Sequence, residues 1–161
     1  MATYPPLAIT PHWNDLNDHL IEVVDLIPEG KLDWSPSPEI WNFRGTLLHT
    51  VGGRLGWLAN TVKDGEPMPD YMARGQSTEG IKELLRESWQ RLERFLFDRE
   101  KLDAVYEHPT GDWGYVDPPI TDGHYIAYHR FVHDVEHRGD ILHLLTQLGV
   151  DPLRDHRRRP L

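Results

Sequence analysis

The segment HRFVHDVEHRGDILHLL, residues 129–145, holds four of the chain's ten histidines. Three of them, His129, His133 and His137, recur at every fourth position, which places them along one side of a helix. The segment belongs to a longer helical pattern that we expect to cover residues 121–148. A row of titratable rings on a helix indicates a solvent-exposed face, a polar core or a metal site. The remaining sequence is needed to decide among these three explanations.

Three further helices are expected upstream, over residues 10–26, 43–62 and 78–99. Apolar residues recur there at intervals of three or four, and no segment shows the period of two that is typical of a strand. Four long helices without strands predict an all-α fold, and we expect a four-helix bundle with long interhelical loops. The loops at 63–77 and 102–119 are long for such a fold, and long loops often build a binding pocket.

Length and composition restrict the class of protein. The 161 residues suit one domain, which we assign to residues 1–150, followed by a basic C-terminal tail at 151–161. The chain has no cysteine, which excludes disulfides, thiolate metal sites and a cysteine nucleophile. The formal net charge of −9 argues against a nucleic-acid partner. We see no secretion signal and no apolar run that could span a membrane, so we expect a cytoplasmic protein without a membrane partner.

His133 and His137 are expected to point into the protein. On a helical wheel of about 100° per residue they share a face with four apolar residues of the last helix, Ile126, Ile141, Leu144 and Leu148. Asp134, Glu136 and Arg138 fall on other faces. An imidazole on a buried face needs partners for its ring nitrogens. Two histidines one turn apart are a common metal-ligand pair, and the alternative is a core pair bonded to each other or to water.

The second expected helix adds a third histidine within a stripe of glycines. His49 shares this stripe with Gly45, Gly52, Gly53 and Gly56. A glycine inside a helix costs about 1 kcal/mol relative to alanine, so the stripe needs a compensating role. Close helix packing and open volume beside His49 are two compatible explanations. The opposite side of the helix is expected to face water, and it carries Thr46, Thr50, Arg54 and Thr61.

If the second and fourth helices are neighbours, His49, His133 and His137 can converge on one ion. Three neutral imidazoles suit a divalent transition metal such as Zn, Ni, Cu or Fe, and not Mg or Ca. Three protein ligands also leave a position open for water or substrate, as in a catalytic zinc site. His129 and Asp140 lie one turn to either side of the pair. Each could hydrogen-bond a ligand ring or lie at the surface, and we expect His129 to be exposed.

Three motifs in combination resemble a known family over roughly residues 13–150. They are DWSPSPEIWNFRGTLLH (33–49), HDVEHRGD (133–140) and LLTQLG (144–149). Together they resemble the DinB-like (DinB/YfiT) superfamily of four-helix bundle proteins. The resemblance implies a metal site made by His49, His133 and His137, with Zn or Ni as the ion, and a homodimer.

The resemblance also narrows the function. Some members are S-transferases or isomerases that use a low-molecular-weight thiol, and others are described as metal-dependent hydrolases or as DNA-damage-inducible proteins. We therefore expect a metal-dependent enzyme acting on a small-molecule substrate, either a low-molecular-weight-thiol S-transferase or a hydrolase. The alternative is a non-catalytic stress-inducible bundle protein whose histidine triad is empty or structural. The family usually has Gln after HRG, whereas this chain has Asp140, which could raise the basicity of a histidine or repel an anionic substrate.

Pocket residues can be nominated but not assigned to a chemical role. The aromatic candidates for pocket walls, for which plain packing is the commoner role, are Trp57, Tyr71, Trp113 and Tyr115. A thiol that carries carboxylates would need cationic neighbours, and the candidates are Arg44, Arg54, Arg130 and Arg138. Neither a Ser-His-Asp triad nor a phosphate-binding loop is visible, and Glu136 does not occupy the glutamate position of an HEXXH motif, so no catalytic residue is assigned.

Overall fold

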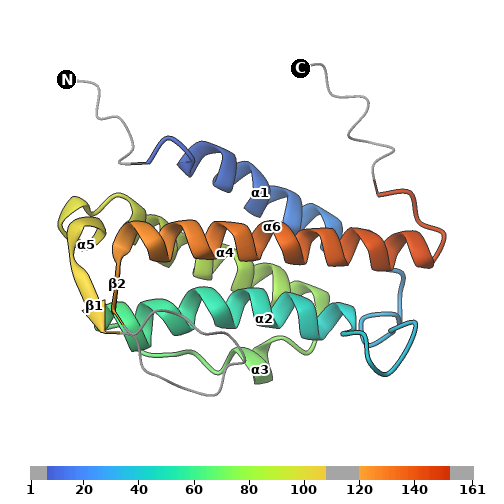
Figure 1. The fold of residues 1–161 in the computed structure, drawn as a ribbon. Coiled ribbons are helices and arrows are strands. Elements are labelled where there is room, and N and C mark those ends of the chain that lie inside the picture. The colour runs from blue at the N-terminus through green and yellow to red at the C-terminus, as the bar shows by residue number, and fades with distance from the viewer. Residues whose placement is uncertain (1–6, 108–119, 153–161) are drawn as a thin grey trace.

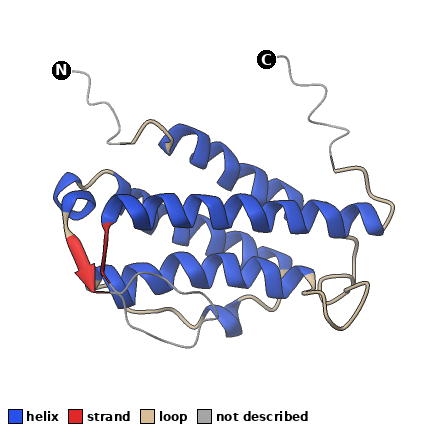
Figure 2. Ribbon diagram, in the orientation of Figure 1, coloured by secondary structure: helices blue, strands red, loops and turns tan. Residues whose placement is uncertain are grey.

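The computed structural model describes residues 7–107 and 120–152, and these are mostly helical (Figure 1). The long helices are α1 (Thr10–Val24), α2 (Phe43–Gly56), α4 (Thr78–Leu96) and α6 (Gly123–Gln147). The shorter elements are the π-helical segment η1 (Trp57–Val62), α3 (Tyr71–Arg74), α5 (Arg99–Asp103), β1 (Val105–Glu107) and β2 (Ile120–Asp122) (Figure 2). The predicted all-α class is confirmed. Among the described residues, no helix combines the length and the apolar character that crossing a membrane requires.

Local signals determine where the long helices begin and end. Asn42, Ser77 and Asp122 each accept a hydrogen bond from the backbone N–H three residues further on, so their side chains cap α2, α4 and α6. Gly149 follows α6 with φ of 76°, a left-handed conformation that commonly ends a helix. The predicted helix at 78–99 is shorter than expected, because α4 ends at Leu96 and α5 begins three residues later.

One small sheet departs from the expectation that no strand is present. Strands β1 and β2 pair antiparallel, with Tyr106 opposite Thr121. Each strand has three residues, too few to show a period of two in the sequence. The sheet lies at one end of the helices and leads directly into α6 (Figure 2).

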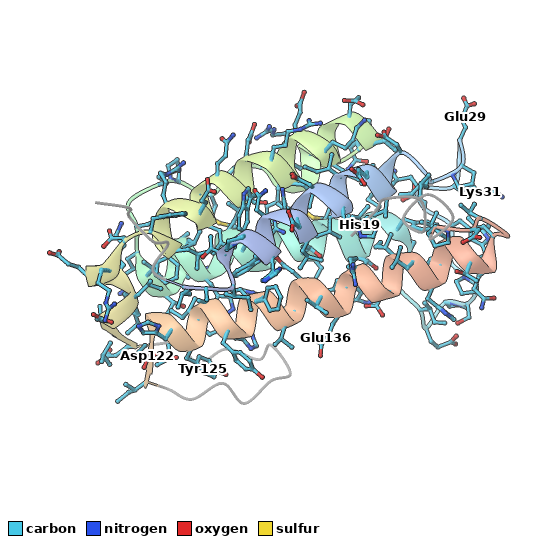
Figure 3. All side chains as sticks on the ribbon, turned by 90° about the horizontal axis from the view of Figure 1, so that it is seen from above. His19, Glu29, Lys31, Asp122, Tyr125 and Glu136 are labelled. Atoms are coloured by element: carbon cyan, nitrogen blue, oxygen red, sulfur yellow. The ribbon has the colours of Figure 1, made fainter. Side chains whose placement is uncertain are left out.

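Helices α1 and α2 each pack against both α4 and α6, and side chains from all four fill the space between them (Figure 3). The buried apolar residues form two clusters, one that includes Leu20, Leu47, Leu85 and Leu144, and one that includes Trp13, Leu58, Trp89 and Ile126. Each long helix places a buried polar residue near the boundary of these clusters: Asn17, Arg54, Ser88 and Asp134. The core therefore contains a polar layer to which all four long helices contribute.

The face of α2 and η1 that was predicted to be exposed to water is in fact buried, so the prediction was wrong for Thr46, Thr50 and Arg54 of α2 and for Thr61 of η1. The hydroxyl of Thr46 donates to the Asn42 carbonyl at 3.0 Å, and that of Thr50 donates to the Thr46 carbonyl at 3.1 Å. Arg54 pairs with a carboxylate of α6. These polar groups tolerate burial because they find partners inside the protein, a property that hydrophobicity alone does not reveal.

Two glycines of α6 provide a matched test of this packing. A Cβ at Gly123 would clash with the Lys101 carbonyl and lie 2.5 Å from Leu102 Cα, whereas a Cβ at Gly139 would have no neighbour within 4 Å. We expect Gly123→Ala to lower the free energy of unfolding by about 1–3 kcal/mol, because the backbone of α5 has to move. Gly139→Ala should raise it by up to about 1 kcal/mol, because alanine favours a helix. Urea denaturation measures both values, and equal effects would contradict the packing described.

Candidate metal centre

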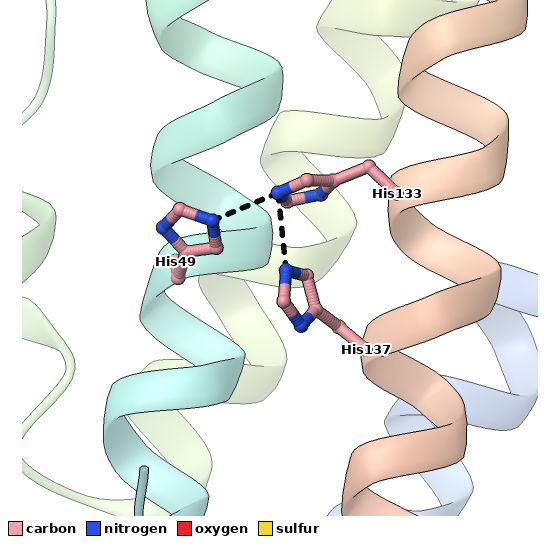
Figure 4. A group of neighbouring side chains, drawn as sticks. All are labelled: His49, His133 and His137. Carbon is pink, nitrogen blue, oxygen red and sulfur yellow. Dashed lines mark hydrogen bonds between the residues drawn. The ribbon is translucent and has the colours of Figure 1, made fainter. Parts of the chain in front are cut away.

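Three histidine side chains from two helices meet at one point (Figure 4). His49 comes from α2, and His133 and His137 come from α6. Nε2 of His133 lies 2.8 Å from Nε2 of His49 and 3.1 Å from Nε2 of His137. The structure thus brings together all three residues that the sequence analysis nominated as metal ligands.

The missing side chain of Gly53 allows this close approach, and that of the adjacent Gly52 admits a different helix. A Cβ on Gly53 would lie 2.5 Å from Nη1 of Arg130 and 3.3 Å from Cε1 of His133. Gly53 therefore admits α6 side chains, one of them a triad member, against the backbone of α2. A Cβ on Gly52 would lie 2.8 Å from Oη of Tyr71, so this glycine admits α3. At both positions close packing explains the presence of glycine.

The donor atoms fit a transition-metal ion. Nδ1 of His137 lies 2.9 Å from Oδ2 of Asp140, so its N–H donates to this carboxylate and Nε2 keeps a lone pair. Nε2 of His133 faces two other Nε2 atoms, and its single proton or lone pair cannot serve both contacts well. One cation would accept all three lone pairs. Nitrogens bound tetrahedrally to zinc at about 2.0–2.1 Å lie roughly 3.3–3.4 Å apart. The two distances from His133 Nε2 are 2.8 and 3.1 Å, and all three nitrogens lie within 4.8 Å of one another.

Two of the rings are held in the form that binds metal. Partial burial of the ring lowers the pKa of His49 to about 4, and the positive charge of nearby Arg130 acts in the same direction. Burial also lowers the pKa of His133 to about 4, although the neighbouring Asp134 opposes this shift. A neutral imidazole has a free lone pair for a metal ion, so both rings are in the binding form at neutral pH.

One side of the triad is open to solvent. His49 is exposed, whereas His133 and His137 are partly buried. The indole of Trp41 contacts the His49 ring with 4.7 Å between centroids and stacks on the His137 ring at 6.3 Å. Trp41 is itself 54% exposed, so it forms a wall at the open side. Trp41 was not predicted as a pocket residue, although its place in the segment that leads into the histidine-bearing helix α2 was a signal for it.

Asp134 lies in the core and not on the separate face that the helical wheel assigned to it. Its side chain is fully buried, and Oδ2 accepts hydrogen bonds from Trp13 Nε1 and Arg54 Nε, both at 2.8 Å. Burial alone would raise the pKa of Asp134, but the charges of Arg54 and Arg130 and the contacts with His133 and Trp13 together outweigh burial, so the pKa is lowered. Arg54 also donates to Asn17 Oδ1 at 2.8 Å and to Ser88 Oγ at 3.3 Å. A buried, ionised carboxylate therefore lies beside the triad residue His133.

His129 and Glu136 do not belong to the triad, and two of the predicted wall residues lie outside the described residues. His129 is half-buried and not exposed as expected, because its ring contacts Trp57 at 5.2 Å and stacks on Tyr125 at 5.7 Å between centroids. Glu136 is exposed and points away from the helices (Figure 3). The predicted wall residues Trp113 and Tyr115 lie outside the described residues, as do residues 153–161 of the basic tail.

Of the four candidate cationic residues, one lies near the triad and three make contacts elsewhere. Arg130 is buried, and its charge lowers the pKa of both His49 and His133, so it lies near the triad. The other three make contacts elsewhere: Arg44 with Asp33, Arg54 with Asp134 and Arg138 with His19. Arg130, whose charge also lowers the pKa of the buried Asp134, is thus the cationic candidate that lies near the triad.

Comparisons with known proteins identify the family. The sequence model of the DinB family matches residues 3–159. The chain belongs to the DinB family. The crystal structure of a DinB-like protein, YjoA of Bacillus subtilis, is similar to this DinB protein with a TM-score of 0.62 and 14% sequence identity, over 89% of this chain and 92% of that one. At this identity the likeness concerns the fold alone. No curated protein gives a significant match.

Removing one ligand from each helix tests the triad as a shared metal site. We expect the wild type to bind about one Zn²⁺ or Ni²⁺ per chain and His49→Ala and His137→Ala to lose most of it, because two imidazoles hold an ion weakly. Elemental analysis after metal loading and gel filtration measures the content. His143→Ala removes an exposed α6 histidine outside the triad and serves as the control. Full metal content in both triad variants would contradict the shared site.

The lowered histidine pKa values predict a pH dependence of stability in the metal-free protein. Between pH about 6.5 and about 4, an unfolded chain protonates His49 while the folded chain does not. The unfolded state binds more protons in this window, so the free energy of unfolding falls as the pH falls through it. We expect His49→Ala to lose less stability than the wild type over this range. Urea denaturation at several pH values measures the difference, and parallel curves would contradict it.

Proposed function

We propose that this DinB protein is a metal-dependent enzyme in which His49, His133 and His137 hold a divalent transition-metal ion, Zn or Ni. The observation that carries the proposal is the convergence of three imidazole nitrogens, all within 4.8 Å of one another, at a site with one exposed side. Three protein ligands leave a coordination position for an external ligand. A bound ion supplies Lewis acidity there and lowers the pKa of a water or thiol that it coordinates.

The chain's own residues would orient and shield the reacting group on a scaffold that we propose to be a four-helix bundle. Asp140 orients the His137 ring through the 2.9 Å contact to its Nδ1. Trp41 places an apolar indole at the open side and excludes water from part of it. Arg130 adds positive charge near His49 and His133. This combination favours an anionic nucleophile at the open position.

The reaction that we propose is S-transfer with a low-molecular-weight thiol, or hydrolysis of a small-molecule substrate. The positive charge of Arg130 supports a thiolate or hydroxide nucleophile. The chain has no cysteine, so a reacting thiol has to come from outside the protein. We further propose a homodimer in the cytoplasm, a compartment in which thiols stay reduced. The net charge of −9 supports a small-molecule partner over a nucleic acid.

A second candidate is a non-catalytic protein in which the triad is empty or structural. The specific observation in its favour is the spacing of the rings, since His133 Nε2 lies within hydrogen-bond distance of His49 Nε2 and His137 Nε2. Histidines at these distances can bond one another without an ion, although the three nitrogens then share too few protons and lone pairs to be fully satisfied. Activity measurements on metal-loaded protein discriminate the two candidates.

Catalysis by the proposed site should depend on both the metal and the triad. We expect Zn²⁺- or Ni²⁺-loaded wild type to accelerate conjugation of a chromogenic aryl halide with at least one thiol among cysteine, glutathione and coenzyme A, or hydrolysis of a nitrophenyl ester. Chelation or His49→Ala should lower the rate by about 100-fold or more, because the Lewis acid is lost. His143→Ala should retain the rate. If loaded protein accelerates none of these reactions, the non-catalytic candidate is favoured.

A further inference from the structure

Two buried polar atoms beside the triad face each other without a hydrogen bond in the described structure. They are Oδ1 of Asp134 and Nδ1 of His133, which lie 3.8 Å apart. Buried polar atoms nearly always have a partner. The two atoms are complementary, because a carboxylate oxygen accepts and a ring N–H donates. A shift of less than about 1 Å by either side chain would bring them to hydrogen-bond distance.

The position of the Asp134 carboxylate is fixed from its other side. Its Oδ2 accepts from Trp13 of α1 and Arg54 of α2. Arg54 is held in turn by Asn17 of α1 and Ser88 of α4. Residues of the three other long helices therefore orient this carboxylate of α6, and both of its fixed bonds use the same oxygen. The remaining oxygen, Oδ1, lies 3.8 Å from Nδ1 of His133, and the positive charge of Arg130 also acts on this carboxylate.

We propose that Asp134 is a positioning residue that holds His133 in the Nδ1–H tautomer. With that proton donated to Oδ1, Nε2 carries the lone pair and faces the Nε2 atoms of His49 and His137. Asp140 contacts the equivalent ring nitrogen of His137, but Asp140 is exposed, so water can replace it. No water competes at the fully buried Asp134. The inference rests on the proposed metal function, because this tautomer presents the Nε2 lone pair to an ion. The tautomer itself can be measured in the metal-free protein.

The first test measures the tautomer in the metal-free wild type. Nitrogen-15 NMR of the histidine rings separates protonated from unprotonated ring nitrogens, and the His133 signals are assigned by their loss in His133→Gln. We expect a protonated Nδ1 and a bare Nε2 at neutral pH. A wild-type His133 ring that carries its proton on Nε2 overturns the proposal, whatever the metal content of the protein.

The second test removes the carboxylate without leaving a buried charge unpaired. Asp134→Asn alone would leave the Arg54 guanidinium without its anion and could unfold the protein. The double variant Arg54→Met/Asp134→Asn removes both charges. Its amide oxygen can still accept from Trp13, and its amide N–H₂ would face His133 Nδ1. We expect the ring to switch to the Nε2–H tautomer and the dissociation constant for Zn²⁺ to rise by about 10–100-fold in a folded variant.

A matched control makes the same chemical change at the exposed carboxylate. Asp140→Asn should leave the His133 tautomer unchanged. If the double variant is folded and keeps both the wild-type tautomer and the wild-type zinc affinity, Asp134 only joins the helices and the proposal is wrong. If the double variant does not fold, the tautomer of His133 measured in the wild type alone decides whether the proposal holds. A wild type that binds no zinc refutes the metal function but still reports, through the tautomer, on the role of Asp134.

Discussion

The buried ion pair between Arg54 and Asp134 is the interaction on which the rest of the structure depends. Both side chains are completely excluded from water. A charge in such a place is strongly destabilising without its partner, so neither residue is compatible with this core unless the other is present. The pair joins α2 to α6, and its further hydrogen bonds reach Trp13 on α1 and Ser88 on α4. Apolar packing on either side tolerates small shifts, whereas hydrogen bonds between charged groups do not.

The same pair determines where the histidines meet. His49 lies five residues before Arg54 on α2, and His133 is adjacent to Asp134 on α6. Once Arg54 and Asp134 are bonded, the two histidine-bearing helices have a defined register, and His49 and His133 lie at neighbouring levels. A metal site requires its ligands to be placed to within about 0.5 Å. The core pair gives the triad this precision, and Gly53 gives it the short distance between the helices.

The sequence predicts the helices and the pair His133 and His137 because both follow from spacing within one segment, whereas His49, 84 residues from His133, was joined to the pair by the family motifs. It does not predict Arg54 and Asp134, whose contact spans 80 residues and depends on a partner that a helical wheel does not contain. The wheel for α6 also omitted Ala127 and Leu145, which are buried. With His133 at zero, both lie at about 120° and Asp134 lies at about 100°, so the buried face is centred near the aspartate. His133 lies at the edge of that face, which explains why the triad is partly accessible.

Stability alone does not explain a charged pair in this core, because apolar residues of similar size are often as stable or more so. The pair does place an ionised carboxylate beside one ligand of the triad, where water cannot substitute for it. His133 thus has a buried carboxylate 3.8 Å from its Nδ1 on the core side, whereas His137 contacts the exposed Asp140 and His49 faces solvent. The triad is consequently enclosed on its inner side and accessible on its outer side. Such an asymmetry suits a site that must hold an ion firmly while it exchanges an external ligand.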